Sequence, residues 1–148
     1  TVEKIRILQS LDFNLDAPTV IAEKARLTAE LFDDYIEYNP VLNKRLSELS
    51  QTYDLALCSN ATRAFVERCV DTLNIRLLLS CGIWTASEYA PKPDTEQWRS
   101  CIESWGGELE NVTIFEDSPV GIMGAKRVGC GVVEVLDAGD LVRKLDEF

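Results

Sequence analysis

Four short apolar runs, separated by segments with helical periodicity, constrain the fold of this chain more than any other feature. They predict β-strands near 54–58, 80–85, 112–115 and 131–136. Each run is continuously apolar, which is typical of parallel strands that are buried on both faces. A regular alternation of strands and helices folds into a parallel sheet covered by helices. The sequence therefore predicts an α/β fold, with a parallel Rossmann-like sheet and helices on both of its faces.

Helices are predicted between these strands and after the last one. Asp94 and Gln97 resemble a capping box at the start of one helix, and a Gly-Gly pair ends it. Ser118 and Pro119 suit the N-cap and the first helical position of another helix. The predicted helices span residues 62–74, 94–105, 118–128 and 139–147.

The first part of the chain lacks strand-like runs and carries helical periodicity instead. Asp16-Ala-Pro18 is typical of a helix start, and Asn39-Pro40 marks a break before a further amphipathic helix. We therefore divide the chain into a helical segment, residues 1–38, and an α/β core domain, residues 39–148.

The composition excludes several classes of function. The 148 residues carry 15 basic and 25 acidic side chains, and the net charge of −10 argues against nucleic acid or an anionic membrane as a partner. The absence of histidine excludes histidine-dependent catalytic triads and histidine ligation of a metal. The five cysteines are odd in number and widely spaced, as in reduced cytoplasmic proteins. No apolar run approaches the length of a membrane span, so we expect a cytoplasmic protein.

Two adjacent acids, Glu116 and Asp117, follow the predicted strand at 112–115 directly. Ligands of open parallel sheets bind outside the carboxyl ends of the strands, where these acids are expected to lie. Neighbouring anions repel each other and are costly to bury unless a cation lies between them. Mg²⁺, a hard cation that prefers oxygen ligands, is the natural counter-ion. The alternative is that Asp117 caps the following helix, although Ser118 is the better-placed cap.

Two further segments carry candidate binding residues near predicted strand ends. Ser59 and Asn60 follow the strand at 54–58, where a hydroxyl group and backbone amides are good phosphate donors. Ser-Asn is also ordinary turn composition. Lys92 stands between two prolines that would hold its loop extended and rigid, and so would fix a positive charge in one place. The alternative is a solvated surface lysine.

In combination, these segments resemble the second, third and fourth motifs of the haloacid dehalogenase-like superfamily. The resemblance is carried by Leu57-Cys-Ser-Asn60, Lys92-Pro-Asp94 and Phe115-Glu-Asp-Ser-Pro-Val-Gly-Ile122. The last segment is similar to the β-phosphoglucomutase and phosphoglycolate-phosphatase branch, whose members act on small phosphorylated metabolites. The similarity covers residues 40–145 strongly. Residues 1–38 resemble the later helices of the family's helical cap, which implies a partial helical cap here.

The resemblance implies a role for each candidate residue. Ser59 and Asn60 would hold the phosphoryl oxygens, and Lys92 would neutralise the phosphoryl group and the nucleophile. Glu116 and Asp117 would hold Mg²⁺. Ser59 and Lys92 would then be catalytic residues of a magnesium-dependent phosphohydrolase or phosphomutase that acts on a small phosphorylated metabolite.

Arg63 is a further candidate for substrate binding. It lies one helical turn beyond Ser59 in the sequence, from where its guanidinium group could reach a second anionic group of the substrate. The alternative is that Arg63 is a surface residue, as arginines at helix starts usually are.

The sequence departs from the family pattern at the nucleophile. In the family this is the first aspartate of a DxDx(T/V) motif, which follows an apolar strand and precedes the cap. The nearest candidate, Asp12-Phe-Asn-Leu-Asp16, follows a helical pattern instead of a strand. The family's nucleophile strand lies between those predicted here at 54–58 and 112–115, so we expect these two strands to flank a gap or a substitute strand. We expect the 148-residue chain by itself to be inactive.

Three explanations for the missing motif are open. The sequence is a fragment of a longer reading frame, or the missing strand comes from another chain through self-association. In the third explanation the protein is a non-catalytic relative that binds magnesium or a phosphorylated ligand. A reading outside this family is an α/β scaffold with a chance pair of acids.

Overall fold

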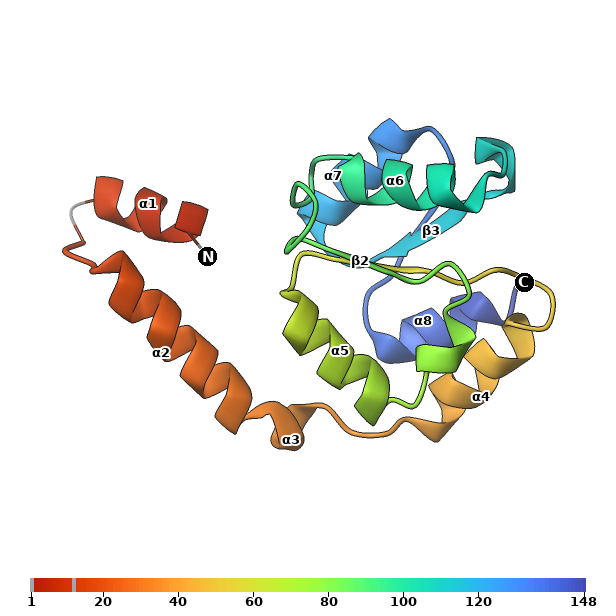
Figure 1. Ribbon diagram of the computed structural model, residues 1–148, viewed down its shortest axis with the longest axis horizontal. Helices are drawn as coiled ribbons and strands as arrows, with labels where there is room; N and C mark the ends of the chain where they lie inside the picture. Colours follow the sequence, from red (N-terminus) through yellow and green to blue (C-terminus); the bar gives the residue numbers. More distant parts are fainter. Residues whose placement is uncertain (1, 12) are drawn as a thin grey trace. The chain divides into compact units, whose positions relative to one another are not determined.

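The computed structural model describes residues 2–11 and 13–148. The chain divides into two compact units, Thr1–Glu37 and Tyr38–Phe148, each of which is described here by itself (Figure 1). The first unit holds only helices, and the second contains all strands of the described residues.

The helical unit comprises α1 (Val2–Ser10), α2 (Ala17–Glu30) and α3 (Phe32–Tyr35). The predicted start of α2 is confirmed, because Asp16 is its N-cap and accepts a hydrogen bond of 3.0 Å from the amide of Thr19. None of the side chains of α2 is buried. A role for this unit as a partial cap stays a prediction.

The α/β unit follows the predicted alternation of strands and helices, and the α/β fold class is confirmed. Each strand or helix observed from residue 57 onward overlaps a predicted one, with ends that differ by a few residues. Short 3₁₀ turns (η1 and η2) lie before β2 and β3. In chain order the elements are α4 (Pro40–Leu49), β1 (Leu57–Ser59), α5 (Arg63–Thr72), η1 (Arg76–Leu78), β2 (Ile83–Thr85), α6 (Glu96–Trp105), η2 (Leu109–Asn111), β3 (Thr113–Glu116), α7 (Pro119–Val128), β4 (Gly131–Glu134) and α8 (Ala138–Leu145).

The strands form two separate parallel pairs. β1 pairs with β2, and β3 pairs with β4, but β1 and β3 are not hydrogen-bonded to each other. Successive residues of a parallel strand direct their peptide groups to opposite edges. The peptide groups of Leu57 and Ser59 face β2, so that of Cys58 faces the other edge of β1. By the same alternation, the peptide group of Phe115 faces the edge of β3 opposite to β4.

Helices cover both faces of these strands, as predicted. Figure 1 shows α6 and α7 on one side and α4, α5 and α8 on the other. The core on the first side is formed by Trp98 of α6, Ala125 and Val128 of α7, and Ile114 of β3. On the second side, buried residues of α5 pack against partly buried residues of β1 and β2. The C-terminal ends of β1 and β3 are thereby supported from α6 and α7.

Local signals give most helix ends correctly, but only half of the predicted capping box forms, because Asp94 accepts a hydrogen bond of 2.9 Å from the amide of Glu96 while Gln97 makes no return contact. Ser118 caps α7, and Gly106 ends α6 in the left-handed conformation, both as expected. However, α6 begins at Glu96, and its N-cap residue Thr95 makes no capping hydrogen bond with its side chain. Gln97 does not reach back to the helix start, because its amide is fully buried and donates to groups outside the helix.

The helices of this protein are short, and α2, with 14 residues, is the longest among the described residues. None of the helices in the described part of the chain combines the length and the apolar character that crossing a membrane requires.

We predict that Gly124→Ala destabilises the α/β unit by about 1–3 kcal/mol, the usual cost of overpacking. A Cβ atom at this position in α7 would lie 2.8 Å from the carbonyl oxygen of Pro93 and 2.8 Å from a ring carbon of Trp98. Urea unfolding followed by tryptophan fluorescence measures the change, because all three tryptophans lie in this unit.

Gly139→Ala is the matched control in α8. Its new Cβ atom would meet only a side-chain oxygen of Asp137, at 3.3 Å, and alanine favours the helix, so we expect a change within about 1 kcal/mol. Equal midpoints for Gly124→Ala and the wild type would contradict the close packing of α7.

Candidate functional site

A buried ion pair joins the loop before α6 to the end of β3. The ammonium group of Lys92 donates a hydrogen bond to the carboxylate of Glu116, the last residue of β3. The two side chains are only 8% and 7% exposed. The sequence places these residues 24 positions apart, so the parallel arrangement of the strands brings them together.

The carboxylate of Glu116 is also held by the start of α7. Its Oε1 atom accepts hydrogen bonds from the amide of Ser118 at 3.2 Å and from the hydroxyl group of Ser118 at 2.7 Å. Burial favours the neutral form, but the hydrogen bonds from Lys92 and Ser118 outweigh it and hold the pKa of Glu116 below its usual value. Gly121 packs against this side chain so closely that a Cβ atom there would overlap the carboxylate. Glu116 is therefore a fixed, ionised group.

Both the backbone and the ammonium group of Lys92 are held in place by neighbouring residues. Asn60 forms two hydrogen bonds with the peptide groups of Lys92, one from the Lys92 amide at 2.6 Å and one to the Lys92 carbonyl at 3.0 Å. The ammonium group lies 4.9 Å from the centre of the Trp98 ring, within the range of a cation–π interaction. The peptide bond that follows, Lys92–Pro93, is cis.

Ser59 lies at the end of β1, beside Asn60 in the sequence. Its hydroxyl oxygen accepts a hydrogen bond of 3.1 Å from the amide of Ala61, which orients the side chain. The hydroxyl hydrogen has no acceptor among the described residues, and the side chain is half-buried. Ser59 can therefore donate this hydrogen to a ligand oxygen.

Asp117 is exposed, unlike its buried neighbour Glu116. The Asp117 carboxylate has no hydrogen bond or ion pair within the part of the chain that the structure describes. No group of three or more acidic or thiol side chains that could hold a metal ion occurs among these residues. Asp12, the first residue of the only near candidate for a nucleophile motif, lies outside the described residues. Asp117 thus carries a carboxylate that is unpaired among the described residues and follows the buried Glu116 directly in the sequence.

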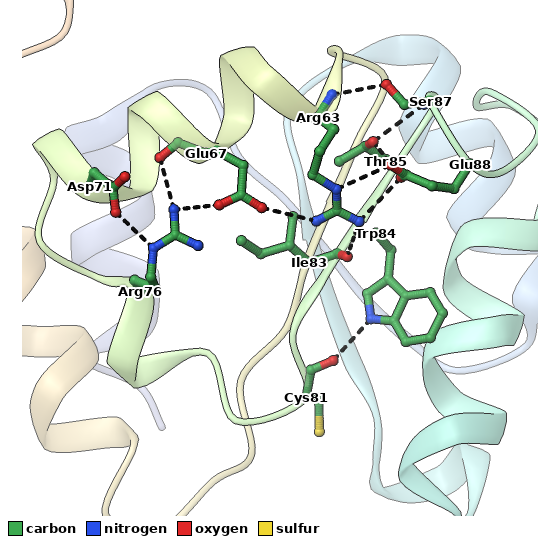
Figure 2. A network of polar contacts seen from close by, with 10 residues as sticks. All are labelled: Arg63, Glu67, Asp71, Arg76, Cys81, Ile83, Trp84, Thr85, Ser87 and Glu88. Atoms are coloured by element: carbon green, nitrogen blue, oxygen red, sulfur yellow. Dashed lines mark hydrogen bonds and ion pairs between the residues drawn. The ribbon is translucent and has the colours of Figure 1, made fainter.

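Arg63 takes part in a separate network of polar contacts (Figure 2). Its guanidinium group forms ion pairs with Glu88 at 3.1 Å and Glu67 at 3.4 Å, and it donates to the carbonyl of Ile83 at 2.8 Å. The hydrogen bond with Glu88 raises the pKa of Arg63. Two carboxylates already compensate its charge, and a contact of Arg63 with a substrate anion stays a prediction.

The structure therefore joins three of the predicted site residues, Asn60, Lys92 and Glu116, in one chain of hydrogen bonds. Ser59 and Asp117 are sequence neighbours of the outer two. Reasoning from the sequence missed Gln97 and Trp98, which contact Asn60 and Lys92 from α6. The sequence feature that could have identified Gln97 and Trp98 is their position, five and six residues after Lys92, at the start of an amphipathic helix.

Comparison with known proteins gives a family match over most of the chain. The model of the haloacid dehalogenase-like hydrolase family matches residues 2–135. A search of curated proteins gave no match.

Several solved structures are similar in fold. A candidate β-phosphoglucomutase from Thermotoga maritima is 21% identical, with a TM-score of 0.67, and the match covers 93% of this chain and 66% of that one. A conserved haloacid dehalogenase-like protein from Agrobacterium tumefaciens is 20% identical, with a TM-score of 0.76 and coverages of 95% and 64%. A family hydrolase from Deinococcus radiodurans, solved with bound phosphate and sodium, is 17% identical, with a TM-score of 0.65 and coverages of 93% and 63%. The chain thus spans slightly less than two thirds of the length of these proteins.

We predict that Lys92→Met destabilises the α/β unit by about 3–5 kcal/mol, because it leaves the buried carboxylate of Glu116 without its partner. The double variant Lys92→Met/Glu116→Gln removes the unpaired charge as well, and we expect it to be clearly more stable than the single variant. Urea unfolding at pH 7 with tryptophan fluorescence compares the two. A double variant no more stable than Lys92→Met would show that the ion pair is not buried in solution.

Proposed function

We propose, because the chain belongs to the haloacid dehalogenase-like hydrolase family, that it carries the phosphate-binding site of a magnesium-dependent phosphohydrolase or phosphomutase. Its substrate would be a small phosphorylated metabolite. The observation that carries this proposal is the buried ammonium group of Lys92, which is held by Glu116 at the end of β3 while its backbone is held by Asn60 after the end of β1.

Ser59, Asn60 and Lys92 would bind the phosphoryl group. Lys92 offers a fixed positive charge, and the Ser59 hydroxyl has a free hydrogen to donate. The backbone amide of Asn60 lies in the turn that leads to α5, a position suited to phosphate oxygens. Donors that are already in place stabilise the charge of a transferring phosphoryl group without reorganisation at the moment of reaction. Arg63 would contact a second anionic group of the substrate only if its ion pairs opened.

The residues at the end of β3 fit a magnesium ion that keeps most of its water ligands. Asp117 offers an unpaired, exposed carboxylate, and oxygen atoms are the ligands that Mg²⁺ prefers. Glu116 would join it as a ligand with the oxygen that now faces Lys92, or through water. Bound there, the ion would supply positive charge next to the phosphoryl oxygens. Lys92 would then have a phosphoryl oxygen as a new anionic partner.

Turnover by this mechanism needs a further carboxylate as the nucleophile. Glu116 and Asp117 are committed to the cation, and no third acidic side chain joins them among the described residues. The edge of β1 opposite to β2 and the edge of β3 opposite to β4 pair with no other strand among the described residues. An extended strand could pair with the peptide groups at these edges. Such a strand, from another copy of the chain or another segment, would complete the sheet and could carry the nucleophile.

The alternative is a non-catalytic relative that binds magnesium or a phosphorylated ligand. The same observation favours it, because Glu116 and Asp117 would be used by the cation and no third acidic side chain joins them among the described residues to serve as the nucleophile.

We predict that the 148-residue chain releases no phosphate from p-nitrophenyl phosphate with Mg²⁺. Adding a synthetic apolar peptide that ends in Asp-x-Asp should restore release, and the Asn-x-Asn peptide is the control. Release by the chain alone that Asp117→Asn abolishes would contradict the need for a further carboxylate. No activity with any peptide, together with intact phosphate binding, would favour the non-catalytic alternative.

We predict that Asp117→Ala weakens magnesium binding by on the order of tenfold or more, since even groups that only orient a metal ligand commonly contribute that much. Isothermal titration calorimetry with MgCl₂ in the presence of inorganic phosphate measures the affinity. Glu110→Ala is the control, because Glu110 is an exposed acid in η2, which precedes β3 and so lies at the opposite end of that strand. Equal affinities for the wild type and Asp117→Ala would refute the metal site.

A further inference from the structure

We propose that Asn60 is a positioning residue, whose side-chain amide holds Lys92 in place instead of binding the phosphoryl group itself. This inference rests on the proposed function for the role of Lys92, but the contact between the two residues can be tested without any ligand. It also narrows the role expected of Asn60, leaving its backbone amide as the group offered to phosphate.

The first support is the pairing between the Asn60 side chain and the Lys92 backbone. The Lys92 amide donates to Oδ1 of Asn60 at 2.6 Å, and Nδ2 of Asn60 donates to the Lys92 carbonyl at 3.0 Å. Two reciprocal hydrogen bonds fix both the position and the orientation of the Lys92 backbone, as the hydrogen bonds of a neighbouring strand would. Lys92 lies in the loop between β2 and α6, and its backbone pairs with none of the strands of the described residues, so one side chain supplies this pairing.

The second support is Gln97, which fixes the orientation of the Asn60 amide. Gln97 is fully buried, and its Nε2 atom donates to Oδ1 of Asn60 at 3.3 Å and to the carbonyl of Ala90 at 3.2 Å. Its Oε1 atom is buried without a partner among the described residues. A buried amide that leaves its own oxygen unsatisfied is costly. The two hydrogen bonds that it donates, to Asn60 and to the loop before Lys92, offset that cost.

The third support is that the Lys92 side chain connects the backbone held by Asn60 to the ammonium group held by Glu116 and Trp98. The Lys92 side chain is 8% exposed and lies against the Trp98 ring on its way to Glu116. A lysine side chain is flexible, but here both its backbone and its ammonium group are tied down. Loss of the Asn60 contact frees the backbone end, so the ammonium group is held by Glu116 and Trp98 alone and is less precisely placed for a phosphoryl oxygen.

One amide hydrogen of Asn60 is not used in these contacts, so direct binding of a ligand is the competing role. Two measurements separate positioning from direct binding. The first follows hydrogen exchange of the Lys92 amide by NMR, with ¹⁵N-labelled lysine. Among the six labelled lysine amides of the chain, that of Lys92 is the one that donates to Asn60 in the described residues, so its signal reports this contact.

We expect Asn60→Ala to speed exchange of the Lys92 amide roughly tenfold, the scale of one lost hydrogen bond. Asn43→Ala is the matched control, because Asn43 also bonds backbone groups, the carbonyls of Leu73 and Asn74, away from Lys92. It should leave the exchange unchanged. If Asn60→Ala does not fold, Asn60→Asp keeps the acceptor but loses the donor, and should speed exchange to a smaller extent. Unchanged exchange in the Asn60 variant, or a Lys92 amide unprotected in the wild type, overturns the proposal.

The second measurement is a double-mutant cycle on the affinity for inorganic phosphate. Asn60→Ala should weaken binding about five- to tenfold in the wild type, on the scale of one hydrogen bond, and should have no effect in the Lys92→Met/Glu116→Gln background. Equal losses in both backgrounds would mean that Asn60 binds phosphate directly and would overturn the positioning role. If the wild type binds no phosphate, the proposed function fails, and the exchange measurement decides the role of Asn60 alone.

Discussion

The buried ion pair between Lys92 and Glu116 is the interaction on which the rest of the site depends. Removing two charges from water is costly, and a buried pair is tolerated only when its geometry is good and its remaining hydrogen bonds are made. Here the carboxylate also accepts two hydrogen bonds from Ser118, and the ammonium group lies over the Trp98 ring. Each of these neighbours makes the pair less costly and more rigid.

The pair also explains why α7 packs so closely against the strand ends. Gly121 leaves room for the Glu116 side chain, and Gly124 leaves room for Pro93 and Trp98. A side chain at Gly121 would displace the Glu116 carboxylate, and one at Gly124 would push α7 away from Pro93, in the loop that carries Lys92. The glycines of this helix, which lower its intrinsic stability, are therefore compensated by the packing that they permit.

At the ends of β1 and β3, most polar side-chain groups of the candidate site already have partners within the protein. Lys92 and Glu116 neutralise each other, whereas the Ser59 hydroxyl hydrogen and the Asp117 carboxylate have no partner among the described residues. A phosphate group and a divalent cation would together satisfy both of them and give Lys92 a second anion. Membership in a hydrolase family and this charge pattern both support the proposed phosphate chemistry, in which the nucleophile would come from a further carboxylate.

The strand–helix alternation and most helix ends can be predicted from the amino-acid sequence alone, because these features depend on neighbours within a few residues. Asn39, Ser118 and Gly106 act where local pattern placed them. The sequence also indicated which strand ends carry polar groups. What those groups contact depends on the three-dimensional packing of the chain. The Gln97 side chain does not bond the start of its own helix but contacts residues up to 37 positions away in the sequence. The Asn60 side chain bonds the backbone of a residue 32 positions away. Such contacts depend on how strands and loops pack, which no local periodicity records.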